Sequence, residues 1–289
     1  MQQEARGATS ARVAGGAGTV REGGGRFEVD GVTVRFGGLT ALNAVSLHVE
    51  QGEVLGVIGP NGAGKTTLFN VVCGFTRPAE GTLRWRGDEL AELRPHQLAG
   101  LGISRTLQGV GLFAGLTVLE NVMTGLSSRA KAGFLPALLG LPGSDKDERA
   151  LRERAAATLE HLGAGQFAER YPGSLPYPVQ KRVALARALV SEPDLLLLDE
   201  PAAGLSNDEM DALGETIREL SGRMGVMLVE HHMDLVMSVC DRITVLDFGK
   251  VIASGTPAQV REDPLVLAAY LGDEGESAAA LGGTEEGRA

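Results

Sequence analysis

The sequence predicts an α/β protein in which strands alternate with helices and a largely helical segment interrupts the alternation. Apolar runs typical of buried strands occur early, as VLGVIG at residues 54–59, and return late, as DLLLLDE, VMLVEH and ITVLDFG between residues 194 and 249. Between these two regions the apolar spacing becomes helical. This order favours one α/β core with a mostly helical subdomain inside it.

The first elements expected along the chain are two half-buried strands. FEVDGVTVRF at residues 27–36 and AVSLHVE at residues 44–50 alternate apolar and polar side chains. Residues 1–25 and 273–289 are rich in glycine and alanine and lack any periodic apolar pattern. We therefore expect disordered tails at both ends and a folded unit over about residues 26–272.

Three helices are expected in the part of the folded unit that follows residue 116. Thr117-x-x-Glu120 is a capping-box pattern that opens the apolar stretch VLENVMTGL. A charged, helix-favouring stretch follows at residues 145–162. From Asn207 onward, apolar residues recur on one helical face. These are Met210, Leu213, Ile217 and Leu220.

The composition narrows the possible function classes. The chain carries 27 basic and 37 acidic residues, a net charge of −10. This balance argues against a nucleic-acid partner, which needs a basic face, although backbone amides can still hold a small phosphate. Cys73 and Cys240 lie in apolar stretches, so buried reduced thiols are expected rather than a disulfide. No apolar run approaches the ~18 residues of a membrane-spanning helix.

The stretch GVIGPNGAGKTTLFN contains the Walker A pattern, from Gly59 through Gly64-Lys65 to Thr66. It lies between an expected strand and an expected helix, which is the setting this motif requires. Glycines let the loop wrap around phosphates and point backbone N–H groups inward, and the helix adds its positive dipole end. Lys65 is expected to reach the β- and γ-phosphates, and the Thr66 hydroxyl is expected to bind Mg²⁺.

The run LLLLDE supplies the matching Walker B motif. Asp199 ends an apolar strand, where its carboxylate can lie near the metal, and Glu200 follows, where it can polarise an attacking water. Alone, this pair would fit a solvated turn; with Walker A upstream, it predicts a nucleoside triphosphate site.

Four further features appear in a fixed order around these motifs. VRFGG carries Phe36, SRTLQGVGLF carries Gln108, LDEPAAGLS extends the Walker B motif, and VMLVEHHMD carries His231. Alone, Phe36 would be assigned to the core, Gln108 to the surface and His231 to a structural position. Together, in this order, they resemble the ATP-binding subunits of ABC transporters over about residues 27–271.

The resemblance implies a P-loop NTPase (RecA-like) core, an antiparallel β-subdomain and an inserted α-helical subdomain at about residues 109–182. It implies that Phe36 stacks on adenine, that Gln108 touches Mg²⁺ and the attacking water, and that Glu200 and His231 are catalytic. Mg²⁺ would be held by Thr66, Gln108 and Asp199. The implied contacts of ATP are Phe36, Gly59, Pro60, Asn61, Gly62, Ala63, Gly64, Lys65, Thr66, Thr67 and Gln108.

Within that family, the stretches VRFGGLTALNAVSL, LFAGLTVLENV and VEHHMDLVMSVCDRITVLDFGKVIASGTP resemble the ATPases of branched-chain amino acid importers. That resemblance implies transmembrane permease subunits, a substrate-binding protein outside the cell, a second ATPase subunit, and a place at the cytoplasmic face of the membrane. The permease contact would lie near residues 108–113. Importers of urea or short amides and ATPases that export lipopolysaccharide share much of the pattern and stay open as alternatives.

The family signature Leu-Ser-Gly-Gly-Gln is altered in this chain, where the segment Leu175, Pro176, Tyr177, Pro178, Val179 and Gln180 takes its place. Proline suits the first turn of a helix, so Pro178 is expected to begin one. It offers no N–H to the γ-phosphate of an ATP held by a partner subunit, and a lost charge-assisted hydrogen bond costs ~1.5–3 kcal/mol. We therefore favour a heterodimer whose partner carries an ordinary signature; a homodimer stays possible.

Two other function classes compete with an importer ATPase. ABC proteins acting on ribosomes or DNA generally carry two cassettes, coiled-coil inserts or zinc cysteines, none of which this sequence has. A regulatory ATP-binding subunit that hydrolyses weakly is favoured by Pro178 and opposed by Glu200 and His231. The enzyme is the leading hypothesis.

Overall fold

The computed structural model describes residues 25–106, 109–126 and 142–270, with backbone only for residues 142–147. Apart from Gly25, the predicted tails at 1–25 and 273–289 lie outside the described residues, and so does Gln108. Within the described ranges, no helix combines the length and apolarity needed to cross a bilayer.

The centre of the fold is a six-stranded sheet in the order β10-β9-β3-β8-β7-β6. All its neighbouring strands run parallel except the edge pair β9 and β10, which is antiparallel. The strands are β3 (Val54–Ile58), β6 (Ile103–Arg105), β7 (Leu195–Asp199), β8 (Gly225–Val229), β9 (Arg242–Asp247) and β10 (Lys250–Gly255). A parallel centre requires crossover connections, and helices supply them.

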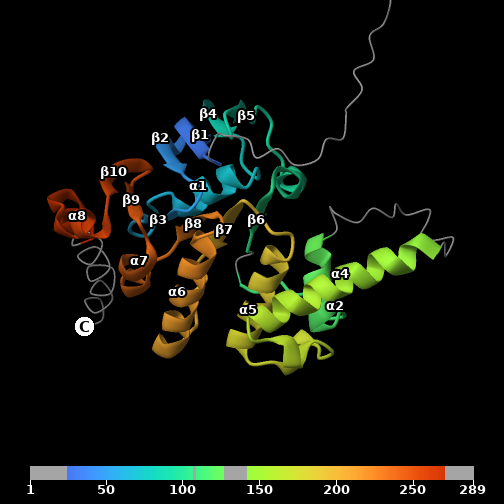
Figure 1. The fold of residues 1–289 in the computed structure, drawn as a ribbon. Coiled ribbons are helices and arrows are strands. Elements are labelled where there is room, and N and C mark those ends of the chain that lie inside the picture. Colours follow the sequence, from blue (N-terminus) through green and yellow to red (C-terminus); the bar gives the residue numbers. More distant parts are fainter. Residues whose placement is uncertain (1–24, 107–108, 127–141, 271–289) are drawn as a thin grey trace, which may run out of the picture.

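A second, antiparallel sheet covers one face, in the order β2-β1-β4-β5 (Figure 1). Its strands are β1 (Phe27–Phe36), β2 (Leu39–Val49), β4 (Glu80–Trp85) and β5 (Asp88–Glu89). Helix α1 (Lys65–Val72) lies between the two sheets, and Leu68, Phe69, Val71 and Val72 are buried there. The first helix of the core is therefore enclosed by sheet on both sides.

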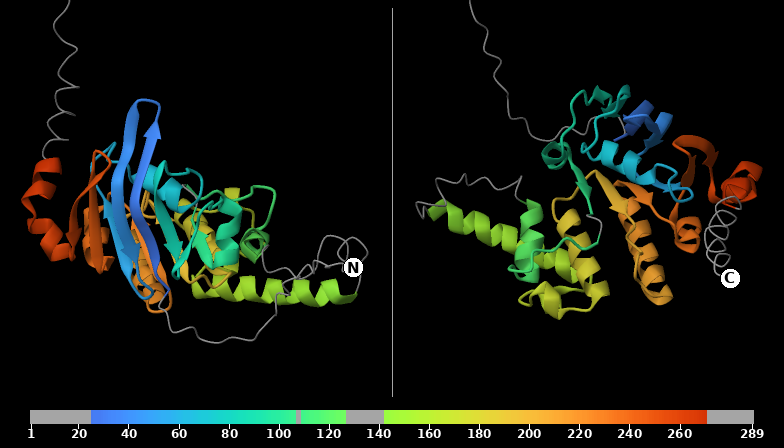
Figure 2. Two further views of the ribbon diagram at one scale, coloured as in Figure 1. Left: turned by 90° about the horizontal axis from the view of Figure 1, so that it is seen from above. Right: turned by 180° about the vertical axis from the view of Figure 1, so that it is seen from behind.

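The remaining helices lie on the opposite face and beyond the edge of the six-stranded sheet (Figures 1 and 2). Helices α2 (Val118–Met123), α4 (Pro142–His161) and α5 (Tyr177–Leu189) pack on one another as a helical unit. Helices α6 (Asn207–Ser221), α7 (Met233–Val239) and α8 (Pro257–Glu262) belong to the core. Short 3-10 helices occur at Pro95–Leu101, Thr124–Leu126, Gly165–Phe167 and Pro172–Ser174.

Buried strand side chains alternate between two cores because successive residues of a strand point to opposite faces. On β7, Leu195 and Leu197 join the core around α1, whereas Leu196 and Leu198 join the core beneath the helices. The continuous leucine run is thus explained by burial on both faces, and the predicted α/β class with a helical insertion is confirmed.

The predicted capping box at α2 is confirmed. The Thr117 hydroxyl accepts from the N–H of Glu120 at 3.2 Å, and the Glu120 carboxylate accepts from the N–H of Thr117 at 2.8 Å. Strands β4, β6 and β10 have no counterpart among the predicted elements. Strand β6 has only three residues, and β10 is a half-exposed edge strand without strict alternation, so neither carries a strong period-2 pattern.

Both cysteines are buried and free, as expected. Burial raises the pKa of the Cys73 thiol to about 11 and that of the Cys240 thiol to about 12. Cys240 lies against Gly56 of β3, where a Cβ built on the glycine would be 2.7 Å from the cysteine Sγ. The close approach of the segment after α7 to β3 therefore depends on glycine at position 56.

We expect Gly56→Ala to lower the free energy of unfolding by about 1–3 kcal/mol, because the added methyl overfills this contact. Gly56→Ala combined with Cys240→Ala should recover part of the loss, since the smaller side chain frees space for the methyl. Urea unfolding of the wild type, both single variants and the double variant measures the coupling. Strictly additive single effects would contradict a direct clash.

Candidate nucleotide site

The residues predicted to act on the nucleotide gather at the carboxyl edge of the parallel strands. The loop with the Walker A pattern follows β3, Asp199 ends β7, and Glu230 to His232 follow β8. Strand β8 lies between β3 and β7, so the three segments are neighbours. Crevices at this edge are where open α/β sheets bind ligands.

Two glycines hold the phosphate loop in a conformation that side chains cannot adopt. Gly59 has φ 152° and Gly64 has φ 101°. A Cβ on Gly59 would be 2.1 Å from the carbonyl oxygen of Leu246, and one on Gly64 would be 2.8 Å from that of Ala41. The loop is therefore packed between the β9–β10 hairpin and β2, with backbone instead of side chains at its contacts.

Helix α1 begins at Lys65, immediately after the loop, as predicted. The Lys65 ammonium donates to the carbonyl oxygens of Gly59 at 2.6 Å and Pro60 at 2.8 Å, which places its positive charge over the loop. Asn61, Gly62 and Thr66 are exposed. Pro60 and Ala63 are buried, and Thr67 is partly buried. Lysine, exposed loop and helix N-terminus together form an anion-binding surface.

Asp199 is half-buried at the end of β7. Burial, helped by the neighbouring carboxylates of Glu200 and Glu230, raises its pKa to about 6, and Arg105 opposes the shift. Its backbone N–H donates to the Thr106 hydroxyl at 3.4 Å. A carboxylate that its surroundings destabilise in this way gains most from a nearby cation.

Glu200 follows in a left-handed conformation, with φ 46°. Its N–H donates to the carbonyl of Val229 at 2.9 Å, which fixes this backbone against the end of β8. Its Oε1 lies 4.0 Å from Nδ1 of His231, and both side chains are partly exposed. A non-glycine residue at positive φ is typical of sites where geometry is held for function.

Glu230 is a buried residue that the sequence analysis did not single out. Its side chain is fully buried, and its carboxylate accepts hydrogen bonds from the N–H of Ala202 (2.7 Å), His231 (2.9 Å) and His232 (3.1 Å). Nδ1 of His232 also lies 2.9 Å from Oε2. Burial alone would raise the pKa of Glu230, but these hydrogen bonds outweigh it and lower the pKa below its ordinary value.

The altered signature segment begins helix α5 one residue earlier than predicted. Pro176 is the N-cap, Tyr177 is the first helical residue and Pro178 is the second. The carbonyl of Pro176 accepts from the N–H groups of Val179 at 3.0 Å and Gln180 at 3.1 Å, so it opens the helix in place of Pro178. Leu175 and Val179 are buried, whereas Pro176 and Tyr177 are exposed.

Tyr177 lies next to the loop that follows Asp199 and Glu200. A Cβ on Gly204 would be 3.0 Å from its ring, and the ammonium of Lys181 lies 5.4 Å from the ring centroid. Lys181 in turn donates to the carbonyls of Glu200 at 3.2 Å and Pro201 at 2.7 Å. Helix α5 therefore supports the backbone of the Walker B loop, a role that the sequence analysis missed.

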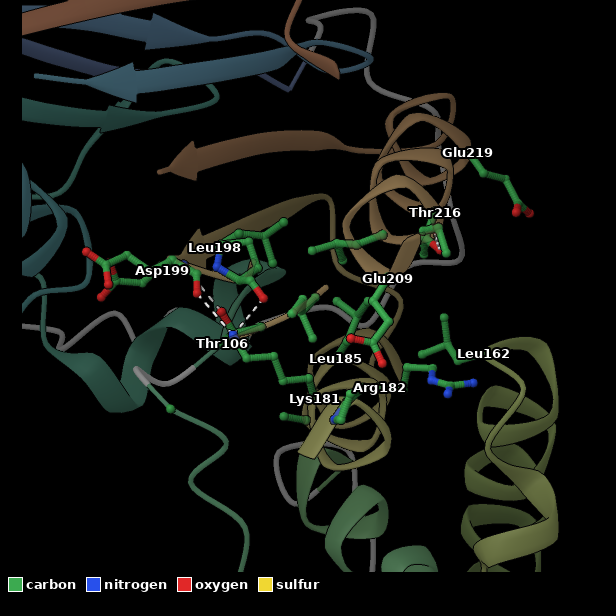
Figure 3. A pocket seen from close by; sticks show the side chains of 18 of the residues that line it. Thr106, Leu162, Lys181, Arg182, Leu185, Leu198, Asp199, Glu209, Thr216 and Glu219 are labelled. Atoms are coloured by element: carbon green, nitrogen blue, oxygen red, sulfur yellow. Dashed lines mark hydrogen bonds between the residues drawn. The ribbon is translucent and has the colours of Figure 1, made fainter. Parts of the chain in front are cut away.

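A cavity of about 380 Å³ opens beside the carboxylates of Asp199 and Glu200, between α5 and α6. Figure 3 shows Asp199, Leu198 and Thr106 at one end and Glu219 and Thr216 at the other, with Lys181 and Arg182 entering from α5. The Walker B carboxylates thus have space on their α5 side.

Phe36 and Ser206, the last residue of the stretch LDEPAAGLS, can also be located. Phe36 ends β1 with 53% of its surface exposed, so it is not a core residue. Ser206 is the N-cap of α6: its N–H and its hydroxyl both donate to the Glu209 carboxylate at 2.9 Å. A serine before an acidic residue three positions on is the capping-box signal that identifies this role in the sequence.

Comparison with known proteins identifies the family. The ABC transporter family model matches residues 42–203. BraF of Pseudomonas aeruginosa, a high-affinity branched-chain amino acid transport ATP-binding protein, is 44% identical over 86% of this chain and 98% of its own length. The chain belongs to the ABC transporter family. This is a family of ATPases, so a nucleotide belongs in the site.

A second relative, a second family model and a solved structure are also similar to this ABC subunit. LivG of Escherichia coli, which carries the same description as BraF, is 42% identical over 86% of this chain and 98% of its own length. The model for the branched-chain amino acid ATP-binding cassette transporter matches residues 250–276. A nucleotide-free ATP-binding cassette of an ABC transporter superposes with a TM-score of 0.74 at 30% identity, covering 85% of this chain and 98% of that one.

The residues of this ABC subunit fit a magnesium nucleotide. The phosphate loop needs glycine at positions 59 and 64, because a Cβ at either position would clash with neighbouring backbone. Lys65 and the start of α1 provide positive charge beside the loop. Burial and the neighbouring carboxylates of Glu200 and Glu230 raise the pKa of Asp199, and a divalent cation beside it would favour the charged carboxylate again. Thr66 and Asp199 are the side chains in the described ranges suited to hold it.

We expect Glu230→Gln to lower the free energy of unfolding by about 1–3 kcal/mol at neutral pH. Both carboxylate oxygens accept N–H groups, whereas the amide keeps one oxygen and turns its NH2 group toward a backbone donor. The pKa of Glu230 is lowered in the folded protein, so its charge stabilises the fold above the unfolded pKa of about 4.5. The difference between wild type and variant should therefore shrink as pH falls below 4.5. Chemical unfolding at several pH values measures it, and a constant difference would contradict the assignment.

Proposed function

We propose that this subunit hydrolyses ATP to drive the import of branched-chain amino acids. The cargo is supported by BraF and LivG, which are named as branched-chain amino acid transport proteins, and by the carboxyl-terminal family match at residues 250–276. A lipopolysaccharide export ATP-binding protein, LptB of Haemophilus influenzae, is less similar at 34% identity. The amino acid importers are therefore the better guide to this chain.

The observation that carries the proposal is the meeting of Asp199, Glu200 and His231 at one edge of the sheet. Asp199 and Thr66 would hold Mg²⁺, whose role is to neutralise the phosphates. Glu200 orients and polarises the attacking water, and its strained backbone keeps the carboxylate in position. His231, 4.0 Å from Glu200, would respond to the γ-phosphate.

The other residues that contact the nucleotide in this proposal are Lys65, Phe36 and Gln108. Lys65 and the loop amides bind the phosphates, and Phe36, exposed at the end of β1, stacks on adenine. Gln108 completes the metal and water contacts. We propose an ABC nucleotide-binding domain over residues 26–272 with its helical subdomain at about 109–182.

A permease subunit is the partner that would anchor this chain at the cytoplasmic face of the membrane. Residues 110–117 form a suitable contact. Asn121, fully buried, accepts from the N–H of Phe113 at 2.7 Å and donates to three carbonyls of the segment, while Arg187 donates to the carbonyls of Val110 and Gly111. The Phe113 side chain is 55% exposed on this fixed backbone, as an interface anchor requires.

We further propose that the working unit pairs this chain with a second, different ATPase subunit. In a head-to-tail dimer, the segment from Pro176 to Pro178 would face the ATP of the partner. Pro176 and Pro178 contribute no N–H, so that ATP would turn over slowly, while the ATP held by this chain would face an ordinary signature. A substrate-binding protein outside the cell would deliver the cargo.

We expect Glu200→Gln to lower ATP turnover at least a hundredfold while ATP still binds, because the neutral amide cannot polarise the water. The same change introduced in the source organism should abolish uptake of radiolabelled leucine. Steady-state phosphate release and cellular uptake are the measurements.

Glu192→Gln is the matched control, since Glu192 also has a positive φ, 47°, but lies in the loop between α5 and β7. It should leave both activities intact. Undiminished hydrolysis in Glu200→Gln would refute the catalytic assignment. Lost hydrolysis with normal leucine uptake would refute the cargo.

We expect Pro178→Gly to raise the turnover of the purified chain at least several-fold, because glycine restores an N–H toward the γ-phosphate. Pro257→Gly is the control, because Pro257 occupies the start of α8, away from the site, and only the helix-start effect of proline is lost there. Steady-state hydrolysis at saturating ATP compares the three proteins. Equal rates in wild type and Pro178→Gly would contradict the weakened-site hypothesis and restore the homodimer.

A further inference from the structure

Glu230, His231 and His232 bring three potential metal ligands together beside the catalytic carboxylate. Within the described residues, one carboxylate oxygen and one nitrogen from each ring lie within 4.8 Å of one another. Oε2 of Glu230 is 2.9 Å from Nδ1 of His232 and 3.7 Å from Nδ1 of His231. The proposed hydrolysis uses His231 but gives no task to His232.

These separations match those between ligands of a transition metal. Zn²⁺ binds imidazole nitrogen and carboxylate oxygen at about 2.0–2.2 Å, so two ligands of a tetrahedral site lie about 3.4 Å apart. The distances of 2.9 and 3.7 Å to Oε2 of Glu230 lie on either side of that value. All three ligand atoms lie within 4.8 Å of one another, so rotation of the two rings can bring them toward the spacing of a tetrahedral site.

The surroundings favour an ion that can enter from solvent. The side chain of His231 is 52% exposed and that of His232 is 31% exposed, whereas that of Glu230 is completely buried. The N–H of Ala202 on Oε1 and the N–H groups of His231 and His232 on Oε2 hold the Glu230 carboxylate in a fixed orientation. Outer hydrogen bonds of this kind orient a metal ligand before the ion arrives.

We propose that Nδ1 of His231, Nδ1 of His232 and Oε2 of Glu230 form a binding site for Zn²⁺ that is separate from the Mg²⁺ site. Two imidazoles and one carboxylate select zinc over magnesium, which prefers oxygen ligands. The ion replaces the proton that Nδ1 of His232 otherwise shares with Oε2 of Glu230. A fourth coordination position faces solvent and accepts water.

Zinc at this site removes His231 from the reaction. Once Nδ1 of His231 is coordinated, the ring is fixed toward Glu230 and is no longer available to Glu200, 4.0 Å away. Zinc therefore inhibits hydrolysis without competing for the phosphate loop. This consequence rests on the proposed ATPase function, whereas zinc binding itself does not.

The first test is zinc binding to the full-length, untagged chain without nucleotide, measured by competition with a chromogenic chelator. His232→Asn removes one ligand yet keeps an N–H donor for Glu230. His161→Asn is the control, since His161 lies 3.6 Å from Glu219 at the end of α4, outside the cluster. Both cysteines are buried, so their thiols do not compete.

We expect one equivalent of zinc on the wild type and on His161→Asn, with affinity at least tenfold weaker in His232→Asn. His232→Gln, a second substitution at the same position, should behave like His232→Asn. Equal affinity in the wild type and both position-232 variants, each folded by circular dichroism, would overturn the proposal.

The second test is ATP hydrolysis at saturating Mg-ATP over a range of buffered free zinc. His232→Asn should match the wild type without zinc and require at least tenfold more zinc for half-inhibition. Equal inhibition of both proteins would refute control of hydrolysis by this site. If none of the proteins hydrolyses ATP, alone or together with the second ATPase subunit, the proposed function fails, and the binding measurement still decides the metal site.

Discussion

The buried carboxylate of Glu230 is the interaction on which the geometry of the carboxyl edge depends. It follows β8, yet it accepts the N–H of Ala202, which lies in the loop that follows β7. The loop that carries Glu200 and the segment that carries His231 are thereby held to a single group. Buried carboxylates are stable only when their hydrogen bonds are complete, so this group permits little independent movement of the two segments.

The phosphate loop is positioned by backbone contacts with segments far away in sequence. Its Ala63 carbonyl accepts the N–H of Gly249 at 3.0 Å, and the carbonyl of Gly249 accepts the N–H of Asn43 at 2.8 Å. The loop, the β9–β10 hairpin and β2 therefore meet backbone to backbone. The antiparallel sheet does more than cover α1, because it also limits where the phosphate loop can lie.

The sequence predicted the parts of the fold that have strong local patterns. The strands of the parallel core appear as long apolar runs because both of their faces are buried, and the start of α1 follows from the glycine pattern before Lys65. Strand β6 escaped prediction because its pairing with β7, and not its three residues, defines it.

The candidate site was predictable in its motif residues and not in the groups that support them. Glu230 accepts a hydrogen bond from Ala202, 28 residues away in the sequence. Lys181 donates to Glu200 and Pro201, 19 and 20 residues away. No local periodicity in the sequence encodes such pairs. Likewise, the start of α5 depends on the carbonyl of Pro176, whose two hydrogen bonds exist only once the chain is folded. Residue type alone therefore favoured Pro178 as the first helical position.

Helix α5 links two distant parts of the molecule through its ends. Tyr177 at its start contacts the loop around Gly204, and Arg187 in its last turn donates to Val110 and Gly111. Ten residues separate these side chains, a length of about 15 Å along a rigid helix. Because each end is tied to a different loop, a tilt of this helix cannot move one loop alone.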